Sequence, residues 1–145
     1  MSDLFENVNK QKLLSHIKNL VSLILADGKV TKSELKVLSV IAVNAGISES
    51  EITRIFSTPE SISFIPPETR KEKIEQLYDM VLVMMADGEI HDDEIALCRS
   101  TAKLLGIENK ILDEIISILI TCIQQGANLN NVIERIEQLC LKSSR

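Results

Sequence analysis

The sequence carries one stretch twice: Ala26-Asp27-Gly28-Lys29-Val30-Thr31-Lys32-Ser33-Glu34 and, sixty residues later, Ala86-Asp87-Gly88-Glu89-Ile90-His91-Asp92-Asp93-Glu94. The Ala-Asp-Gly, the β-branched residue two places after the glycine and the glutamate six places after it keep their spacing. The same register aligns residues 10–56 with residues 70–116 without a gap, and most apolar positions fall on apolar positions. An internal duplication of this kind governs the fold, because each copy encodes one structural unit.

Apolar residues before the first copy recur at the spacing of an amphipathic helix. We expect this helix to run from about Lys10 to Asp27-Gly28, where glycine supplies the left-handed conformation that closes a helix. His16 lies off its apolar face and is expected to be solvated. The predicted inward residues are Leu13, Leu14, Ile17, Leu20, Val21 and Ile24.

The second predicted helix has a clear start signal. Thr31 and Glu34 have the spacing of a capping box, in which hydroxyl and carboxylate each satisfy an otherwise unpaired N–H. Gly46 closes this helix, and Ser48 caps a shorter third one. The predicted buried residues of the second helix are Leu35, Leu38, Ile41, Ala42 and Ala45.

Residues 58–66 form the linker between the two halves. Three apolar residues of this linker are expected to pack on the core, namely Ile62, Phe64 and Ile65. Of these, Phe64 and Ile65 are candidates for a homodimer contact if they are exposed. We expect Pro67 to start the fourth helix, because proline suits the first turn of a helix.

The sequence therefore predicts an all-α protein with seven helices and a single domain over residues 1–145. The first repeat covers about residues 10–57, the second about 67–125, and an extra helix over about 128–141 has no counterpart in the first half. Neither repeat can cover its own apolar face. Packing the two around a pseudo-twofold axis buries both faces in one bundle.

Composition narrows the function classes. The net charge is −5, so nucleic acid is not an expected partner. The three cysteines form no C-x-x-C pair, which favours a reduced compartment. The sequence begins with no signal-peptide pattern, and its apolar runs are shorter than a membrane span needs. We expect a cytoplasmic protein that does not insert into a membrane.

The repeated loops share the Asp-Gly…Glu tail of a calcium-binding EF-hand, but the ligand positions before the aspartate are apolar. One loop alone therefore cannot supply enough oxygens. If the pseudo-twofold axis brings both loops to one end, Asp27, Glu34, Asp87 and Glu94 converge on a site for Ca²⁺, Mg²⁺ or Mn²⁺, with His91 as a candidate nitrogen ligand. In the alternative interpretation, the two glutamates cap helices and the two aspartates bind local amides.

Other chemistry has weaker support in the sequence. Cys98 and Cys122 fall on core faces and are expected to pack there. No set of residues has the pattern of a nucleophile, a base and an oxyanion site, and no nucleotide-binding glycine fingerprint occurs. We therefore expect a protein that is not an enzyme.

Two A-D-G-x-[IV]-x-x-x-E motifs in an acidic, all-α chain resemble the tellurite-resistance TerB-like family, and the same module is similar to the N-terminal region of membrane-anchored DnaJ-type co-chaperones. The resemblance covers residues 10–125 and rests on six positions: Asp27, Gly28, Glu34, Asp87, Gly88 and Glu94. It implies a non-enzymatic role in bacterial stress response. It also implies docking onto other proteins, including a complex at the membrane, through an acidic surface. The alternative hypothesis is a divalent-metal sensor or buffer that uses the paired acidic loops.

Overall fold

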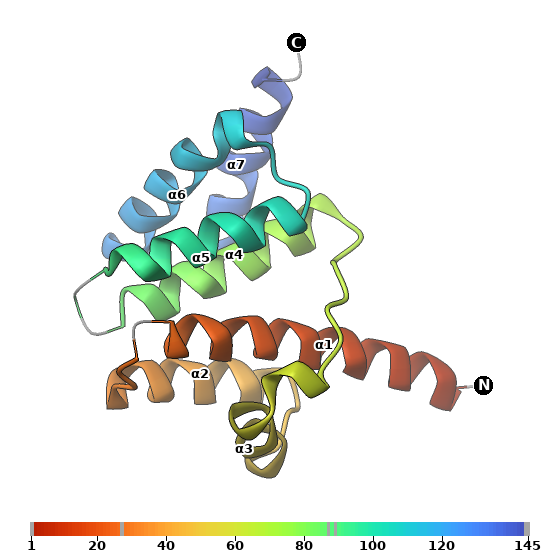
Figure 1. The fold of residues 1–145 in the computed structure, drawn as a ribbon. Helices are drawn as coiled ribbons and strands as arrows, with labels where there is room; N and C mark the ends of the chain where they lie inside the picture. The colour runs from red at the N-terminus through yellow and green to blue at the C-terminus, as the bar shows by residue number, and fades with distance from the viewer. Residues whose placement is uncertain (1, 27, 87, 89, 144–145) are drawn as a thin grey trace.

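The computed structural model describes residues 2–26, 28–86, 88 and 90–143, with side chains described between residues 9 and 139. These residues form seven α-helices and one short 3₁₀-helix, and they contain no strand, which confirms the all-α prediction (Figure 1). The helices are α1 Ser2–Leu25, α2 Lys32–Asn44, α3 Glu49–Ser57, α4 Arg70–Met84, α5 Asp92–Leu104, α6 Asn109–Gln124 and α7 Leu129–Ser143, with η1 at Pro59–Ser61.

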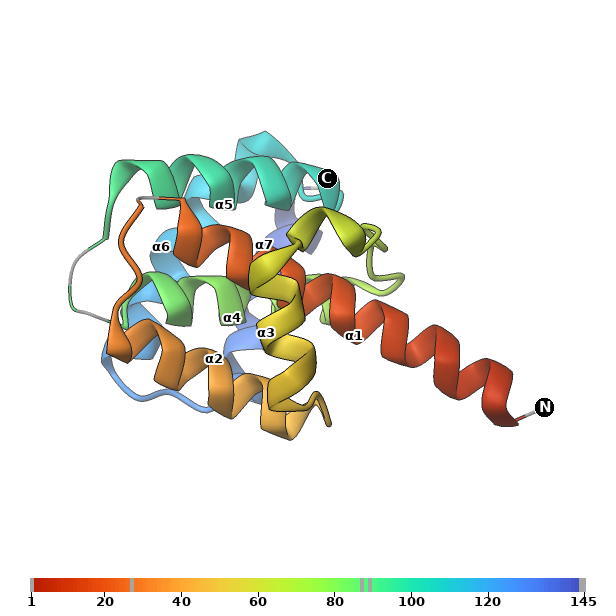
Figure 2. The same cartoon turned by 60° about the horizontal axis from the view of Figure 1, so that its bottom comes forward.

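Helices α1 and α4 pack against each other at the centre of the molecule. Both run in the same direction, so their C-terminal ends lie at one end of the molecule, together with the starts of α2 and α5 (Figures 1 and 2). Helix α1 also contacts α5, and α4 contacts α2. Each half therefore packs its first helix on the second helix of the other half. The pseudo-twofold axis itself stays a prediction.

The helix starts follow local side-chain chemistry. The Thr31 hydroxyl accepts the Glu34 N–H at 3.1 Å, and the Glu34 carboxylate accepts the Thr31 N–H at 2.9 Å, which completes the predicted capping box. The fourth helix begins at Arg70, three residues after the predicted start at Pro67. The reason is Thr69, whose hydroxyl accepts the Glu72 N–H at 3.1 Å and so acts as the N-cap.

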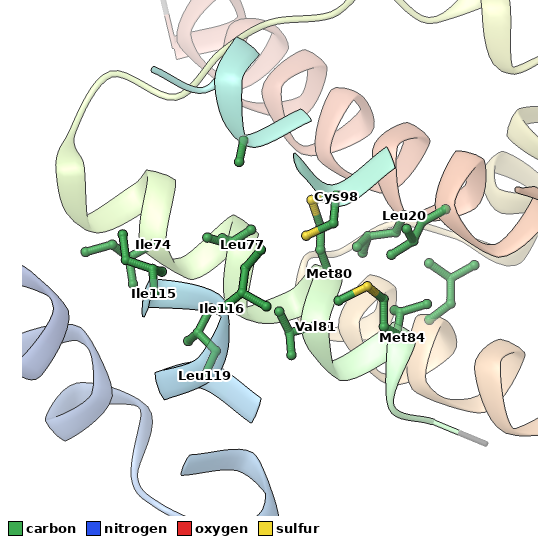
Figure 3. Close-up of a cluster of buried hydrophobic side chains, with 14 of the residues drawn as sticks. Leu20, Ile74, Leu77, Met80, Val81, Met84, Cys98, Ile115, Ile116 and Leu119 are labelled. Carbon is green, nitrogen blue, oxygen red and sulfur yellow. The ribbon is translucent and has the colours of Figure 1, made fainter. Parts of the chain in front are cut away.

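One cluster of buried apolar side chains runs through both halves. Figure 3 shows part of it, where residues of α1, α4, α5 and α6 converge. Met80 and Met84 lie in this cluster at 1% exposure each, so they fill the core and do not line a groove. Because the chain has few aromatic residues, aliphatic side chains and methionines make up nearly all of the buried surface.

Two predicted core positions of the first half are wrong. Leu35 is 38% exposed, whereas its neighbour Glu34 is buried at 2% exposure. The capping box directs the Glu34 side chain back to the N-terminus of α2, where this side chain is buried. Leu13 is 37% exposed and lies at the edge of the core face of α1.

The linker is tied to α1 by hydrogen bonds. The Ile65 N–H donates to the Ser15 hydroxyl at 2.8 Å, and the Lys18 ammonium group donates to the Ile62 carbonyl at 2.6 Å. The Ile62 side chain packs against the core, as predicted. Phe64 and Ile65 are half-buried, and the homodimer contact stays a prediction.

Helix α7 closes the bundle against α4 and α6. Val132, Ile133 and Ile136 on this helix are buried in the common core. None of the helices in the described ranges combines the length and the apolar content that crossing a bilayer requires.

Candidate functional site

The structure gives a partial view of the predicted metal site. The ends of α1 and α4 and the starts of α2 and α5, which we call the Asp-Gly end, lie together (Figures 1 and 2). Asp27 and Asp87 fall outside the described residues, so convergence of the four carboxylates stays a prediction. Glu34 and Glu94 are described, and both are buried at 2% exposure or less.

Each of these two glutamates caps its own helix. Glu34 Oε1 accepts from the Thr31 N–H and the Thr31 hydroxyl, both at 2.9 Å. In the second copy, the His91 N–H donates to Glu94 Oε1 at 3.3 Å, and His91 is the N-cap residue of α5. These contacts fit the capping interpretation of the two glutamates. Within the described part of the chain, no three His, Cys, Asp or Glu side chains form a group that could hold a metal ion.

A cleft of about 630 Å³ lies elsewhere, between α1, α2 and α4. We call it the α1/α4 cleft. Its volume falls within the roughly 300–1,000 Å³ typical of ligand sites. The lining residues are Asn9, Lys12, Leu13 and His16 of α1, Ile41, Asn44 and Ala45 of α2, and Glu72, Glu75, Gln76 and Asp79 of α4.

The lining residues of α1 and of α4 each follow one face of their helix. On α1 they are spaced i, i+3, i+4 and i+7, and the same spacing recurs on α4, so each helix contributes one continuous stripe. Each stripe borders the buried face of its helix. Leu13, Ile41 and Ala45 form the apolar part of the lining.

His16 and Asp79 form a polar pair across the junction of the two halves. His16 Nε2 lies 2.8 Å from Asp79 Oδ2, and His16 is only 8% exposed. An ionised carboxylate only accepts hydrogen bonds, so His16 Nε2 carries the hydrogen and donates the hydrogen bond to Asp79. His16 Nδ1 is buried without a hydrogen-bond partner in the described part of the chain, so in the neutral ring it is the bare nitrogen.

The predicted solvation of His16 is therefore wrong. The periodicity of α1 alone places His16 off the apolar face, but in the structure Asp79 of α4 lies against it. A sequence signal does exist, because both stripes place polar residues beside the apolar face of the first helix in each half. Only the tertiary structure shows that His16 meets Asp79, since the alignment of the halves pairs His16 with Gln76.

The cleft has a negative electrostatic character. Three carboxylates of α4 line it, whereas Lys12 is the one ammonium group among the described lining residues and is paired with Glu68 at 3.1 Å. Glu72 accepts the Thr69 hydroxyl at 3.1 Å. Glu75 is half-buried and makes no hydrogen bond or ion pair with any described residue. Burial, with the charge of Asp79 adding to it, raises the pKa of the adjacent Tyr78 above 10.0.

Both described thiols are buried, as expected. Cys98 and Cys122 are free and lie in the common core. Burial raises the pKa of the Cys98 thiol to about 12, against a smaller lowering effect of Arg99. A neutral, inaccessible thiol is a packing residue and a poor nucleophile.

Comparison with known proteins gives no assignment for this chain. No family model matches it, and no similar curated protein or solved structure was found. The resemblance to the TerB-like family stays a prediction that rests on the repeated loops.

Proposed function

We propose that this chain is a non-enzymatic protein-interaction module that acts in the cytoplasm as part of a bacterial stress response. The TerB-like resemblance of the repeated loops supplies the biological context. The observation that carries the proposal is the α1/α4 cleft, a preformed groove of about 630 Å³ with both apolar and charged lining residues.

The polar groups of the cleft favour a binding role over a catalytic role. His16 is held by Asp79, and Glu72 is held by Thr69, so both serve to fix the walls of the groove. Leu13 is 37% exposed at its edge, and covering it would remove apolar surface from water. A fixed groove with an exposed apolar edge is suited to receive a partner with little rearrangement.

Site-specific photocrosslinking in the native host tests this proposal. A benzoylphenylalanine at Asn44, which is exposed at the cleft, is expected to form adducts with a defined partner protein. The matched control carries the same group at Ser117, an exposed position on α6. Adducts at neither position, or equal adducts at both, would contradict a docking role for the cleft.

A thermal-shift experiment separates the metal-sensor alternative. A resident cation raises the melting temperature by mass action. A rise with Ca²⁺, Mg²⁺ or Mn²⁺ that the Glu34→Gln/Glu94→Gln variant loses would favour the sensor and count against the interaction module. We expect no such rise. We also expect the double variant to be less stable, because both glutamates cap helices.

A further inference from the structure

The α1/α4 cleft has a marked imbalance of charge. Its carboxylates Glu72, Glu75 and Asp79 all come from one face of α4, at positions i, i+3 and i+7. The opposing ammonium group of Lys12 is engaged by Glu68, outside the cleft lining. Half-buried carboxylates interact more strongly with a cation than exposed ones do, because water screens them less. The cleft therefore favours a positively charged occupant.

Glu75 and Asp79 differ from Glu72 in the carboxylate oxygens that remain available to a ligand. Glu75 has no partner in the described residues, and Asp79 uses one oxygen, Oδ2, for His16. They are one helical turn apart, so a single lysine or arginine side chain could contact both. The buried imidazole of His16 holds Asp79 in place.

The apolar surface extends beyond the cleft. Leu13 and Ile41 line it, and Val40 lies one turn before the lining residue Asn44 on α2. Val40 is 56% exposed. The cleft with its rim therefore offers a surface on which apolar side chains of α1 and α2 lie beside the carboxylates of α4. It fits a segment of polypeptide that carries apolar residues on one face.

We infer that the α1/α4 cleft binds a cationic, amphipathic segment of a partner protein. Lysine or arginine side chains of the segment contact Glu75 and Asp79, and its aliphatic side chains pack on Leu13, Ile41 and Val40. This inference rests on the proposed interaction function and names the chemistry of the partner.

The test uses the full chain and a fluorescein-labelled peptide in which Leu-Lys-Lys-Leu repeats. The matched probe replaces every lysine by glutamate. Fluorescence anisotropy is expected to show saturable binding of the lysine peptide only, weakening as salt is raised. Amide chemical shifts in ¹⁵N spectra are expected to change at the cleft residues of α1, α2 and α4.

Two variants locate the binding. Glu75→Gln/Asp79→Asn removes the charges while the new amide oxygen still accepts from His16, and affinity is expected to fall about tenfold or more. Glu114→Gln/Glu134→Gln makes the same change in net charge at exposed positions of α6 and α7 and is expected to leave affinity within about twofold. Leu13→Lys, at a position that reaches solvent, places a competing cation at the cleft and should also weaken binding about tenfold.

Three outcomes would overturn the inference: no binding of the lysine peptide, equal binding of the glutamate peptide, or equal loss of affinity in both double variants. If the Asn44 crosslink forms in cells while any of these is found, the interaction function stands and the partner has different chemistry. If the crosslink is absent as well, both proposals fail.

Discussion

At the scale of single residues, the buried glutamates show what the repeated stretch does. Glu34, and not its neighbour Leu35, is buried, and Glu34 accepts two hydrogen bonds from Thr31. The sequence pattern predicted the capping contact but not the burial. A capping box is a local device, so four residues of sequence suffice to predict it. The depth at which it lies depends on the helices packed over it.

Removal of the Thr31 hydroxyl should destabilise the protein measurably. Thr31→Ala removes the acceptor for the Glu34 N–H and one of the donors to a buried carboxylate, and it should lower the free energy of unfolding by about 1–2 kcal/mol. The control is Thr53→Ala, an exposed position within α3, where a change below about 0.5 kcal/mol is expected. Equal midpoints of urea unfolding for the two variants would contradict the capping role.

Cys98 gives a second prediction at this scale. With a folded-state pKa of about 12 against an ordinary value of 9.0, native Cys98 holds about a thousandth of the usual thiolate at pH 8. Iodoacetamide followed by peptide mass spectrometry should label Cys98 in urea but not in the native protein. Rapid native labelling at pH 8 would show that the thiol is accessible.

The same pKa shift has a consequence for stability. The folded state keeps its thiol proton up to a higher pH than the unfolded chain does, because burial penalises the thiolate. The contribution of Cys98 to stability is therefore complete below about pH 9. It is lost progressively as the pH rises toward 12.

At the scale of elements, helix type was predictable and helix ends were only partly so. Thr31 and Ser48 mark the starts of α2 and α3 correctly, since both form capping boxes. The start of α4 that Pro67 predicts is three residues too early. Proline suits the first turn of a helix but also the residues just before that turn. The polar stripes of α1 and α4 were visible as sequence, but a cleft needs α1, α2 and α4 together. Periodicity within one helix carries no information about the neighbour it faces.

Helix α7 has no counterpart in the first half, and its buried face predicts that it is part of the core. Ile136 is fully buried, so Ile136→Ala should lower the free energy of unfolding by about 2–5 kcal/mol. Glu134→Ala on the exposed face of the same helix should change it by less than about 0.5 kcal/mol. Urea unfolding of the two variants measures both effects. If both variants change the free energy of unfolding by similarly small amounts, α7 is not part of the core.

At the scale of the whole molecule, the duplication predicted that the two halves share one buried core. Buried side chains of α1, α2 and α3 belong to the same cluster as those of α4, α5 and α6. The shared end of α1 and α4 is the arrangement on which the acidic-site hypothesis depends (Figures 1 and 2). The cleft and the His16–Asp79 pair could not be predicted, because both arise only where the first helices of the two halves meet.

The central claim is that two repeats share one core and form a single cooperative domain. Urea unfolding of the full chain, followed residue by residue in ¹⁵N NMR spectra, tests it most directly. Native amide signals of α2 and α3 should disappear at the same urea concentration as those of α5 and α6. If the signals of one half persist at concentrations where those of the other half have gone, the halves are separate folding units and the account is contradicted.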